Sequence, residues 1–333
     1  MPQVRVSTLA AAINDAAILG DRQAVVASIT NDSREVSRGS LYAALPGEHV
    51  DGHRFIGDAV RAGATAILCS RPPEAVPTGV GVIVTTWPRF SLSAISNAFF
   101  GEPSTRLRVL GVTGTDGKTT TVHFVHQLLK ATDEATAFLS TAAREIDTGE
   151  EANLIHQSTP EAPVVHRQLA AMADAGKKFA VLESTSHGLS SKSCRLAHVQ
   201  YAAAVITTLG HEHLEYHRTF ARYRHDKANL FRALDAGCYA AAREFEADNP
   251  EREQMLGPVP EGRLSLLTED LRSSCARGRP FGVMNINCRD AGYFAAATTR
   301  PVFAYGIDTT RNGALQARIL QSTATATNFR LVW

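Results

Sequence analysis

Residues 111–121 read GVTGTDGKTTT and stand between a short apolar run and a segment with helical periodicity. Residues 108–112 are typical of a buried strand, and the apolar residues in 122–129 recur at the spacing of one helix face. Glycines at such a junction let backbone N–H groups turn toward an anion at the N-terminus of the helix. The stretch therefore predicts a phosphate-binding loop in an α/β fold.

The residues after the glycines suit a triphosphate. Lys118 can neutralise phosphate oxygens, and the hydroxyl of Thr119 can hold Mg²⁺. The strict phosphate-loop pattern has a glycine six residues before the lysine, where this chain has Val112, so the loop is a variant. The alternative is a glycine-rich turn with an exposed lysine. We expect a nucleoside triphosphate site.

Further apolar runs follow this loop, separated by helical spacers. They lie at residues 137–139, 179–182, 202–206, 281–284 and 302–304. Strands that alternate with helices predict a mostly parallel sheet covered on both faces, with ligands at the carboxyl ends of the strands. Residues 241–280 are charged and rich in Pro and Gly, and we expect a surface excursion with some helix there.

The N-terminal part predicts a separate, small α/β domain. Short apolar runs at 41–45, 66–68 and 80–84 flank a helix-like stretch at 56–62. Gly and Pro punctuate residues 99–104, so we expect one domain at 1–104 and a second at 105–333.

Composition excludes several classes of protein. The 333 residues carry 34 Lys and Arg against 33 Asp and Glu, so no global charge draws the chain to nucleic acid or an anionic membrane. The five cysteines are scattered, which argues against a disulfide framework or a zinc ribbon. Without a signal-like N-terminus or a membrane-length apolar run, we expect a cytoplasmic protein, which we take to be monomeric.

Polar residues beyond the loop suggest a metal site. Glu183 ends an apolar run. In nucleotide-binding sheets, a carboxylate at such a strand end, next to the phosphate loop, holds Mg²⁺. The alternative for Glu183 is a solvated cap at the end of the strand. Residues 211–217 read HEHLEYH. His213 and His217 are four residues apart and could bind zinc together if they lie on one helix face. A role connected with Mg²⁺ is the preferred interpretation of this cluster. Lys227 lies in a helix-compatible stretch, and spacing alone does not separate it from an ordinary solvated lysine.

Taken together, these segments resemble the Mur ligase family, and within it the MurE type, the UDP-N-acetylmuramoyl-tripeptide synthetases. Residues 31–39 and 45–53 resemble the uridine-binding domain of that type. Residues 113–120 are similar to the ATP loop T-G-T-N-G-K-T-T, and residues 158–162 to T-T-P-E-A. The resemblance continues in order through 183–189 (E-V-S-S-H-A/G-L), 211–217 (R-D-H-L-D-Y-H) and 223–231 (Y-x-x-x-K-x-x-L-F).

The resemblance implies roles for individual residues. The catalytic residues would be Lys118, Glu183, His213 and Lys227. Mg²⁺ would be held by Thr119, Glu183, His213 and Lys227, the last after its amine has added CO₂ to form a carbamate. ATP would contact Gly114, Thr115, Asp116, Gly117, Lys118, Thr119, Thr120 and Asn285. The sugar-peptide substrate would contact Ser33, Glu48, His49, Val50, Ser158, Thr159, Thr185 and Arg195.

The implied reaction is amide synthesis through an acyl phosphate. ATP, with Mg²⁺, activates the terminal carboxylate of UDP-N-acetylmuramoyl-dipeptide, and an amino acid is added during peptidoglycan precursor synthesis. The family also has a third, C-terminal domain, and because this sequence stops at Trp333 we expect that domain to be absent and 105–333 to be incomplete at its C-terminal end. The alternatives are a truncated, non-catalytic paralogue that binds nucleotide or UDP-sugar, and a simple ATPase.

The sequence departs from the family pattern at several motif positions. Asp116 stands where the ATP loop has Asn, and an extra carboxylate beside phosphates is repulsive unless it points away or holds a cation. Residues 283–288 read VMNINC where the family reads V-I-N-A-D-D, so both acidic residues are missing there.

Overall fold

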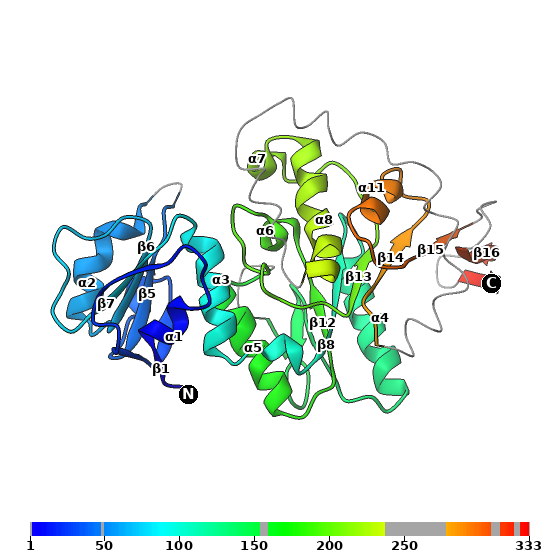
Figure 1. The fold of residues 1–333 in the computed structure, drawn as a ribbon. Coiled ribbons are helices and arrows are strands. Elements are labelled where there is room, and N and C mark those ends of the chain that lie inside the picture. The colour runs from blue at the N-terminus through cyan, green and yellow to red at the C-terminus, as the bar shows by residue number, and fades with distance from the viewer. Residues whose placement is uncertain are drawn as a thin grey trace. The chain divides into compact units, whose positions relative to one another are not determined.

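The chain forms two compact units. The computed structural model describes residues 2–47, 50–153, 159–236, 278–307, 314–322 and 327–332. Unit 1 consists of Met1–Pro103, Pro160–Ala170 and Lys192–His198, and unit 2 of Ser104–Thr159, Ala171–Ser191 and Val199–Trp333. Figure 1 shows both units. The domain boundary between residues 104 and 105 stays a prediction.

Unit 1 is built on a five-stranded sheet in the order β2-β7-β6-β5-β4. The strands are β2 (Ala17–Gly20), β4 (Ser28–Thr30), β5 (Ser40–Ala44), β6 (Ala66–Cys69) and β7 (Gly81–Val84). Pairing is parallel from β4 to β7 and antiparallel between β2 and β7, while β1 (Val4–Arg5) pairs with β3 (Val25–Val26) apart from this sheet. The three predicted apolar runs fall in β5, β6 and β7, and the predicted helix contains α2 (Ile56–Arg61).

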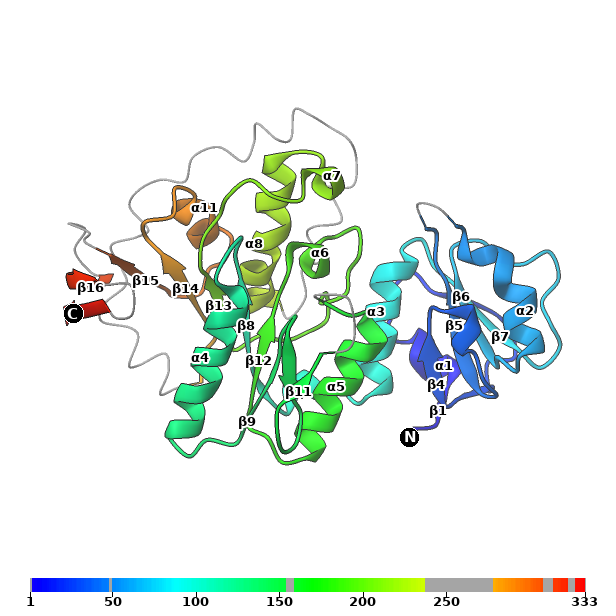
Figure 2. The ribbon, with the colours of Figure 1, turned by 180° about the vertical axis from the view of Figure 1, so that it is seen from behind.

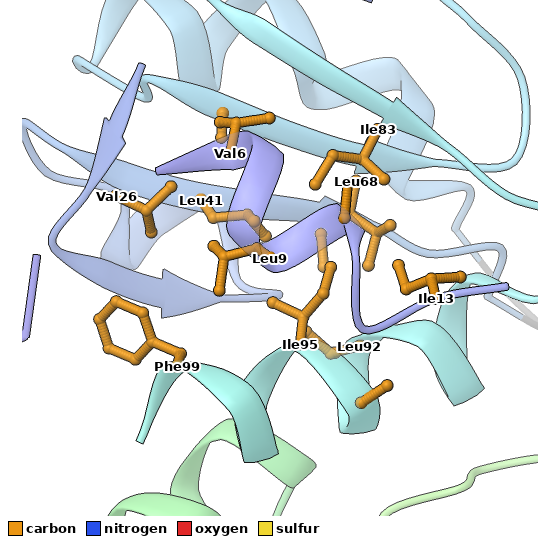
Figure 3. Packing of buried hydrophobic residues seen from close by; sticks show 14 of the residues in the cluster. Val6, Leu9, Ile13, Val26, Leu41, Leu68, Ile83, Leu92, Ile95 and Phe99 are labelled. Carbon is orange, nitrogen blue, oxygen red and sulfur yellow. The ribbon is translucent and has the colours of Figure 1, made fainter. Parts of the chain in front are cut away.

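Both faces of this sheet are covered, because successive strand residues point to opposite sides. On one side, Leu41 and Leu68 pack with α1 (Val6–Ala10) and α3 (Pro88–Phe99), as Figure 3 shows. On the other side, Tyr42 and Ile67 pack against α2. The periodicity of 56–62 predicted α2, whereas α1 and α3 were not predicted from the sequence.

The core between α1, α3 and the sheet predicts the effect of one truncation. Leu9 on α1 is fully buried there, beside Leu41 and Ile95. We expect Leu9→Ala to lower the free energy of unfolding of unit 1 by about 2–5 kcal/mol, because it leaves a cavity in a close-packed core. Urea unfolding followed by circular dichroism measures this effect. An unchanged transition midpoint would contradict the packing described here.

Unit 2 contains a ten-stranded sheet among the described residues, in the order β11-β10-β9-β12-β8-β13-β14-β15-β16-β17. Its strands are β8 (Arg108–Thr113), β9 (Thr136–Leu139), β10 (Ala143–Glu145), β11 (Glu151–Ala152), β12 (Phe179–Glu183), β13 (Ala203–Ile206), β14 (Phe281–Asn285), β15 (Val302–Ile307), β16 (Ala314–Ser322) and β17 (Thr327–Val332). The strands from β9 to β16 in this order are parallel, and β10, β11 and β17 are antiparallel additions at the two edges. The predicted α/β class and mostly parallel sheet are confirmed.

Helices lie on both faces of this sheet. Val112 on β8 packs with Val122 of α4 (Lys118–Ala131), whereas a Cβ on the preceding Gly111 would lie 2.5 Å from Leu230 Cδ1 of α8 (Phe220–Ala236). Because neighbouring strand residues face opposite ways, α4 and α8 cover opposite faces. Accordingly, α8 lies in front of the sheet in Figure 1 and α4 in front in Figure 2. Gly111 lets α8 approach the strand closely.

Shorter helices complete the described part of the chain: α5 (Ala162–Asp174), α6 (Ser186–Leu189), α7 (Leu214–His217) and α11 (Ala291–Ala296). The excursion predicted at 241–280 lies almost wholly outside the described residues. Among the helices that are described, none is both long and apolar enough to span a membrane.

Candidate functional site

The predicted phosphate loop connects β8 to α4 and is formed by residues 114–117. Gly114 has φ +146°, and a Cβ there would lie 1.9 Å from Thr207 Oγ1 and 3.1 Å from the backbone N of Thr208. Gly117 caps the N-terminus of α4 with φ +77°. Both positions need glycine, since each has a backbone conformation that side chains rarely adopt and Gly114 also lacks space for one.

Residues just after β13 hold this loop in place. The Thr207 hydroxyl lies 3.2 Å from the Thr113 carbonyl oxygen and 2.5 Å from that of Asp116. The backbone N–H of Thr115 donates to the Thr208 carbonyl at 2.8 Å, and the Asp116 N–H donates to Thr208 Oγ1 at 3.1 Å. The Asp116 side chain is exposed. The backbone of the loop is thus fixed by the protein itself.

Lys118 begins α4 and folds back over the loop. Its Nζ donates to the carbonyl oxygen of Thr115 at 2.7 Å, and the residue is partly exposed. The positive end of a 14-residue helix and an ammonium group therefore converge beside Gly114–Gly117. Such a place attracts a multiply charged anion.

Glu183 ends β12 next to this loop, because β12 pairs with β8 and places Glu183 opposite Val112. Its Oε2 accepts from Thr119 Oγ1 at 2.9 Å and from the backbone N–H of Thr141 at 2.8 Å. Its Oε1 accepts from Thr141 Oγ1 at 2.9 Å. The carboxylate is buried and held on both oxygens, so a freely solvated cap, the alternative from the sequence, does not describe it.

The pair formed by Thr119 and Glu183 fits a magnesium ion. A hydroxyl and a carboxylate are hard oxygen ligands, and here they lie 2.9 Å apart, with Thr119 in the first turn of α4 and Glu183 at the carboxyl end of β12. Within the described residues, no group of three or more His, Cys, Asp and Glu side chains could hold a metal ion by itself. Mg²⁺ at this pair would take its remaining ligands from phosphate and water, as it commonly does.

Lys227 lies on α8 directly behind the loop. The residue is 1% exposed, its Nζ donates to the carbonyl oxygen of Gly114 at 2.7 Å, and the same nitrogen lies 4.6 Å from the centre of the Tyr223 ring. Burial, reinforced by the nearby positive charge of Lys118, lowers the pKa of Lys227 to about 7, although the carboxylates of Glu212, Glu183 and Asp116 oppose this shift. The alternative of an ordinary solvated lysine is wrong.

The two histidines weighed as a zinc pair have different partners. His213 is exposed, has φ +55°, and its Nδ1 lies 3.3 Å from Glu215 Oε1. His217 is buried, with Nδ1 2.8 Å from Asp226 Oδ2. Because His213 precedes the first residue of α7 in a left-handed conformation, the two residues do not share a helix face, which is why the spacing misled.

His213 nevertheless lies near the other predicted ligands. Its ring centre is 4.9 Å from that of His187 and 6.5 Å from that of Tyr223, the ring below Lys227. The structure therefore brings Lys118, Thr119, Glu183 and Lys227 around one loop, with His213 at the margin of the cluster. The catalytic and metal-binding roles of these residues stay predictions.

The predicted substrate contacts fall in both units. In unit 1, Ser33 opens a short 3-10 helix, Val50 is 51% exposed, and Arg195 Nη2 lies 2.7 Å from Glu161 Oε1. In unit 2, the hydroxyls of Thr159 and Thr185 are 2.8 Å apart. Glu48, His49 and Ser158 lie outside the described residues.

The remaining predicted ATP contacts lie around the loop and the end of β14. Thr120 is exposed on the first turn of α4. Asn285, predicted to contact adenine, ends β14, and its Oδ1 accepts from the backbone N–H of Asn287 at 3.0 Å.

Two residues of this cluster were missed by the sequence analysis. Thr141 makes both of its hydrogen bonds to Glu183 from the loop after β9, and Tyr223 shares a 2.9 Å hydrogen bond with Thr115 Oγ1. The rule that ligands gather at the carboxyl ends of parallel strands would have found Thr141, which follows a predicted strand. No spacing rule connects Tyr223 to Thr115.

Comparisons with known proteins agree with this architecture. The family model described as Mur ligase middle domain matches residues 112–257, and the one described as Mur ligase family, catalytic domain matches residues 25–97. The chain belongs to the Mur ligase family.

Within the family, the chain is similar to proteins of the MurE type. It is 44% identical over 211 residues to the UDP-N-acetylmuramyl-tripeptide synthetase of Treponema pallidum, covering 63% of this chain and 39% of that protein. It is 30% identical over 307 residues to the UDP-N-acetylmuramoyl-L-alanyl-D-glutamate--2,6-diaminopimelate ligase of Bacillus velezensis, covering 92% of this chain and 54% of that protein. The chain thus spans about half the length of these relatives.

A solved structure of a UDP-N-acetylmuramoyl-L-alanyl-D-glutamate--2,6-diaminopimelate ligase shares the fold. It matches 100% of this chain and 58% of its own, with a TM-score of 0.71 and 20% sequence identity.

Proposed function

We propose that this chain binds ATP with Mg²⁺ and UDP-N-acetylmuramoyl-dipeptide, and that it serves ATP-dependent ligation of an amino acid to that dipeptide. The observation that carries the proposal is the cluster of Lys118, Thr119, Glu183 and Lys227 around the loop at residues 114–117. A triphosphate tail needs positive charge and backbone N–H donors, and its Mg²⁺ needs hard oxygen ligands. The cluster supplies the charge and the oxygen ligands, and the first turn of α4 supplies the N–H donors.

The proposed reaction has two steps. First, the terminal carboxylate of the dipeptide attacks the γ-phosphorus of ATP, the bond to the bridging oxygen breaks, and ADP leaves with its electron pair. Second, the amine of the amino acid attacks the acyl phosphate, the C–O bond breaks, and inorganic phosphate and a proton leave as the amide forms. The first step brings two anions together, so charge screening by Lys118 lowers its barrier. Thr119 and Glu183 would hold Mg²⁺, which when bound would screen the same negative charges.

Lys227 suits a carbamate in this site. Only a neutral amine can add CO₂, and a lysine whose pKa is about 7 is about half neutral near pH 7, whereas a solvated lysine is almost wholly protonated there. The carbamate would turn this buried amine into an anion that suits a hard metal ion. His213 is the further predicted ligand at the margin of the cluster.

The proposal is tested by phosphate release from ATP. We expect phosphate release that requires both UDP-N-acetylmuramoyl-dipeptide and an amino acid. Candidate amino acids are added one at a time. Ligand binding without turnover would favour the non-catalytic paralogue, and hydrolysis independent of the dipeptide would favour the simple ATPase.

Removal of the Lys118 ammonium separates binding from turnover. We expect Lys118→Ala to lower turnover by about 100- to 1000-fold, because charge on the transferred phosphoryl group loses its stabilisation. Nucleotide affinity should fall less, because the backbone N–H groups and the helix N-terminus remain. Parallel measurement of kcat and of the ATP dissociation constant checks both; an equal loss in the two would contradict the transition-state role.

A further inference from the structure

A buried imidazole and a buried carboxylate join the segment that carries His213 to α8, which carries Lys227. Nδ1 of His217, the last residue of α7, lies 2.8 Å from Oδ2 of Asp226 on α8. The side chains are 0% and 1% exposed. Asp226 immediately precedes Lys227, and His217 follows His213 by four residues.

Two polar atoms of this pair have no hydrogen-bond partner among the described residues: Nε2 of His217 and Oδ1 of Asp226. Aromatic rings surround the imidazole instead, with ring centres of His187 at 5.5 Å, Tyr223 at 5.3 Å and Tyr216 at 4.8 Å. A buried pair that is only half satisfied is weak evidence for a contribution to stability, because desolvation offsets the attraction. Its presence is better explained by what it holds in place.

The pair closes a chain of contacts around the candidate site. Tyr223 joins α8 to the phosphate loop through Thr115, and Lys227 joins it to Gly114. The bond between His217 and Asp226 joins α8 to α7, whose first residue follows His213. This bond is therefore one of the contacts that fix the position of His213 relative to Lys227.

We propose that His217 and Asp226 are a positioning pair, which sets His213 and Lys227 at the separation that metal binding needs without touching the metal or the substrate. The inference rests on the proposed function, because it concerns Mg²⁺ at the same site. Groups that orient metal ligands from behind typically change metal affinity by 10- to 100-fold when removed. The expected signature is thus a change in Mg²⁺ dependence rather than in folding.

The test uses the full chain and measures ATP binding over a series of MgCl₂ concentrations, together with thermal unfolding. The variant His217→Phe/Asp226→Leu removes the bond and both buried polar groups, so we expect an unfolding temperature no lower than that of the unsubstituted chain. We expect its half-saturating Mg²⁺ concentration to rise by about tenfold or more. His217→Asn keeps an N–H donor near the place of Nδ1 and should restore Mg²⁺ dependence to within about twofold.

A second buried histidine–carboxylate pair provides the matched control. His126 on α4 lies 3.3 Å from Glu145 on β10, with side chains 5% and 6% exposed. We expect His126→Phe/Glu145→Leu to leave the Mg²⁺ dependence of ATP binding unchanged. A shift as large as that of the His217 and Asp226 variant would overturn the positioning role, because it would report general loosening of unit 2.

The outcomes separate this inference from the proposed function. If the unsubstituted chain binds ATP with Mg²⁺ and the His217→Phe/Asp226→Leu variant does so with the same Mg²⁺ dependence, the positioning role is overturned and the proposed function stands. If the unsubstituted chain binds no ATP, both are overturned. Should the first variant fail to fold, His217→Phe/Asp226→Asn replaces it, because asparagine keeps the shape of Asp226. We expect the same rise in the half-saturating Mg²⁺ concentration, and an unchanged Mg²⁺ dependence would overturn the positioning role.

Discussion

Replacement of Gly114 with alanine is expected to weaken ATP binding by roughly 100-fold. The new Cβ would lie 1.9 Å from Thr207 Oγ1 and 3.1 Å from the backbone N of Thr208, at φ +146°. Thr207 cannot simply turn away without loss, since its hydroxyl also holds the carbonyl oxygens of Thr113 and Asp116. Backbone strain of this kind is worth about 1–3 kcal/mol, and each 1.4 kcal/mol changes a dissociation constant about tenfold. Isothermal titration with ATP and Mg²⁺ measures the loss.

The control for this variant is another glycine of unit 2 with positive φ. Gly149 has φ +80° between β10 and β11, and a Cβ there would meet nothing within 4 Å. Gly149→Ala therefore adds a similar backbone strain without a clash and away from the loop, and ATP affinity should stay unchanged. If Gly114→Ala binds ATP as well as Gly149→Ala does, the loop geometry described here is not what binds the nucleotide.

Replacement of Lys227 with alanine is expected to lower amino-acid-dependent phosphate release by about 100- to 1000-fold, because a proposed ligand is lost from the Mg²⁺ that would stabilise charge at the reacting phosphoryl group. Added formate or acetate should restore part of the activity, since a small carboxylate can occupy the space of the missing side chain and replace the anionic carbamate. Unchanged activity in Lys227→Ala would refute its metal role.

The pH dependence of carbamylation follows from the environment of Lys227. Burial lowers its pKa from 10.5 to about 7, so the amine is mostly protonated at pH 6 and mostly neutral at pH 8. Because only the neutral amine adds CO₂, the carbamate signal of the chain in ¹³C-bicarbonate should grow as the pH rises through 7. Lys227→Ala should lose that signal, and a signal that persists would assign the carbamate to another group.

The sequence predicted those parts of the site that lie along one strand, turn and helix. The loop at residues 114–117 and the adjoining Lys118 and Thr119 follow from local spacing, because a strand, a glycine turn and a helix N-terminus are local structures. Glu183 was predicted from its place at the end of a strand, and pairing of β12 with β8 brings it to the loop. The parallel sheet followed from the alternation of apolar runs and helical spacers.

Features that depend on packing between distant segments could not be predicted. The sequence did not show whether Lys227 is buried or solvated, because its burial depends on the way in which α8 packs against the loop through Tyr223 and Gly114. The helical spacing of His213 and His217 failed, since the helix begins only at Leu214. The antiparallel edge strands β10, β11 and β17 are short or irregular pairings that no strong periodicity marks.

We expect residues 113–120 to bind the triphosphate of ATP together with Mg²⁺. Equilibrium titration of the purified chain with ATP, with and without MgCl₂, measures this binding. It should be saturable at roughly micromolar to millimolar ATP and should strengthen when Mg²⁺ is present. No measurable affinity for ATP in the presence of Mg²⁺ would contradict it.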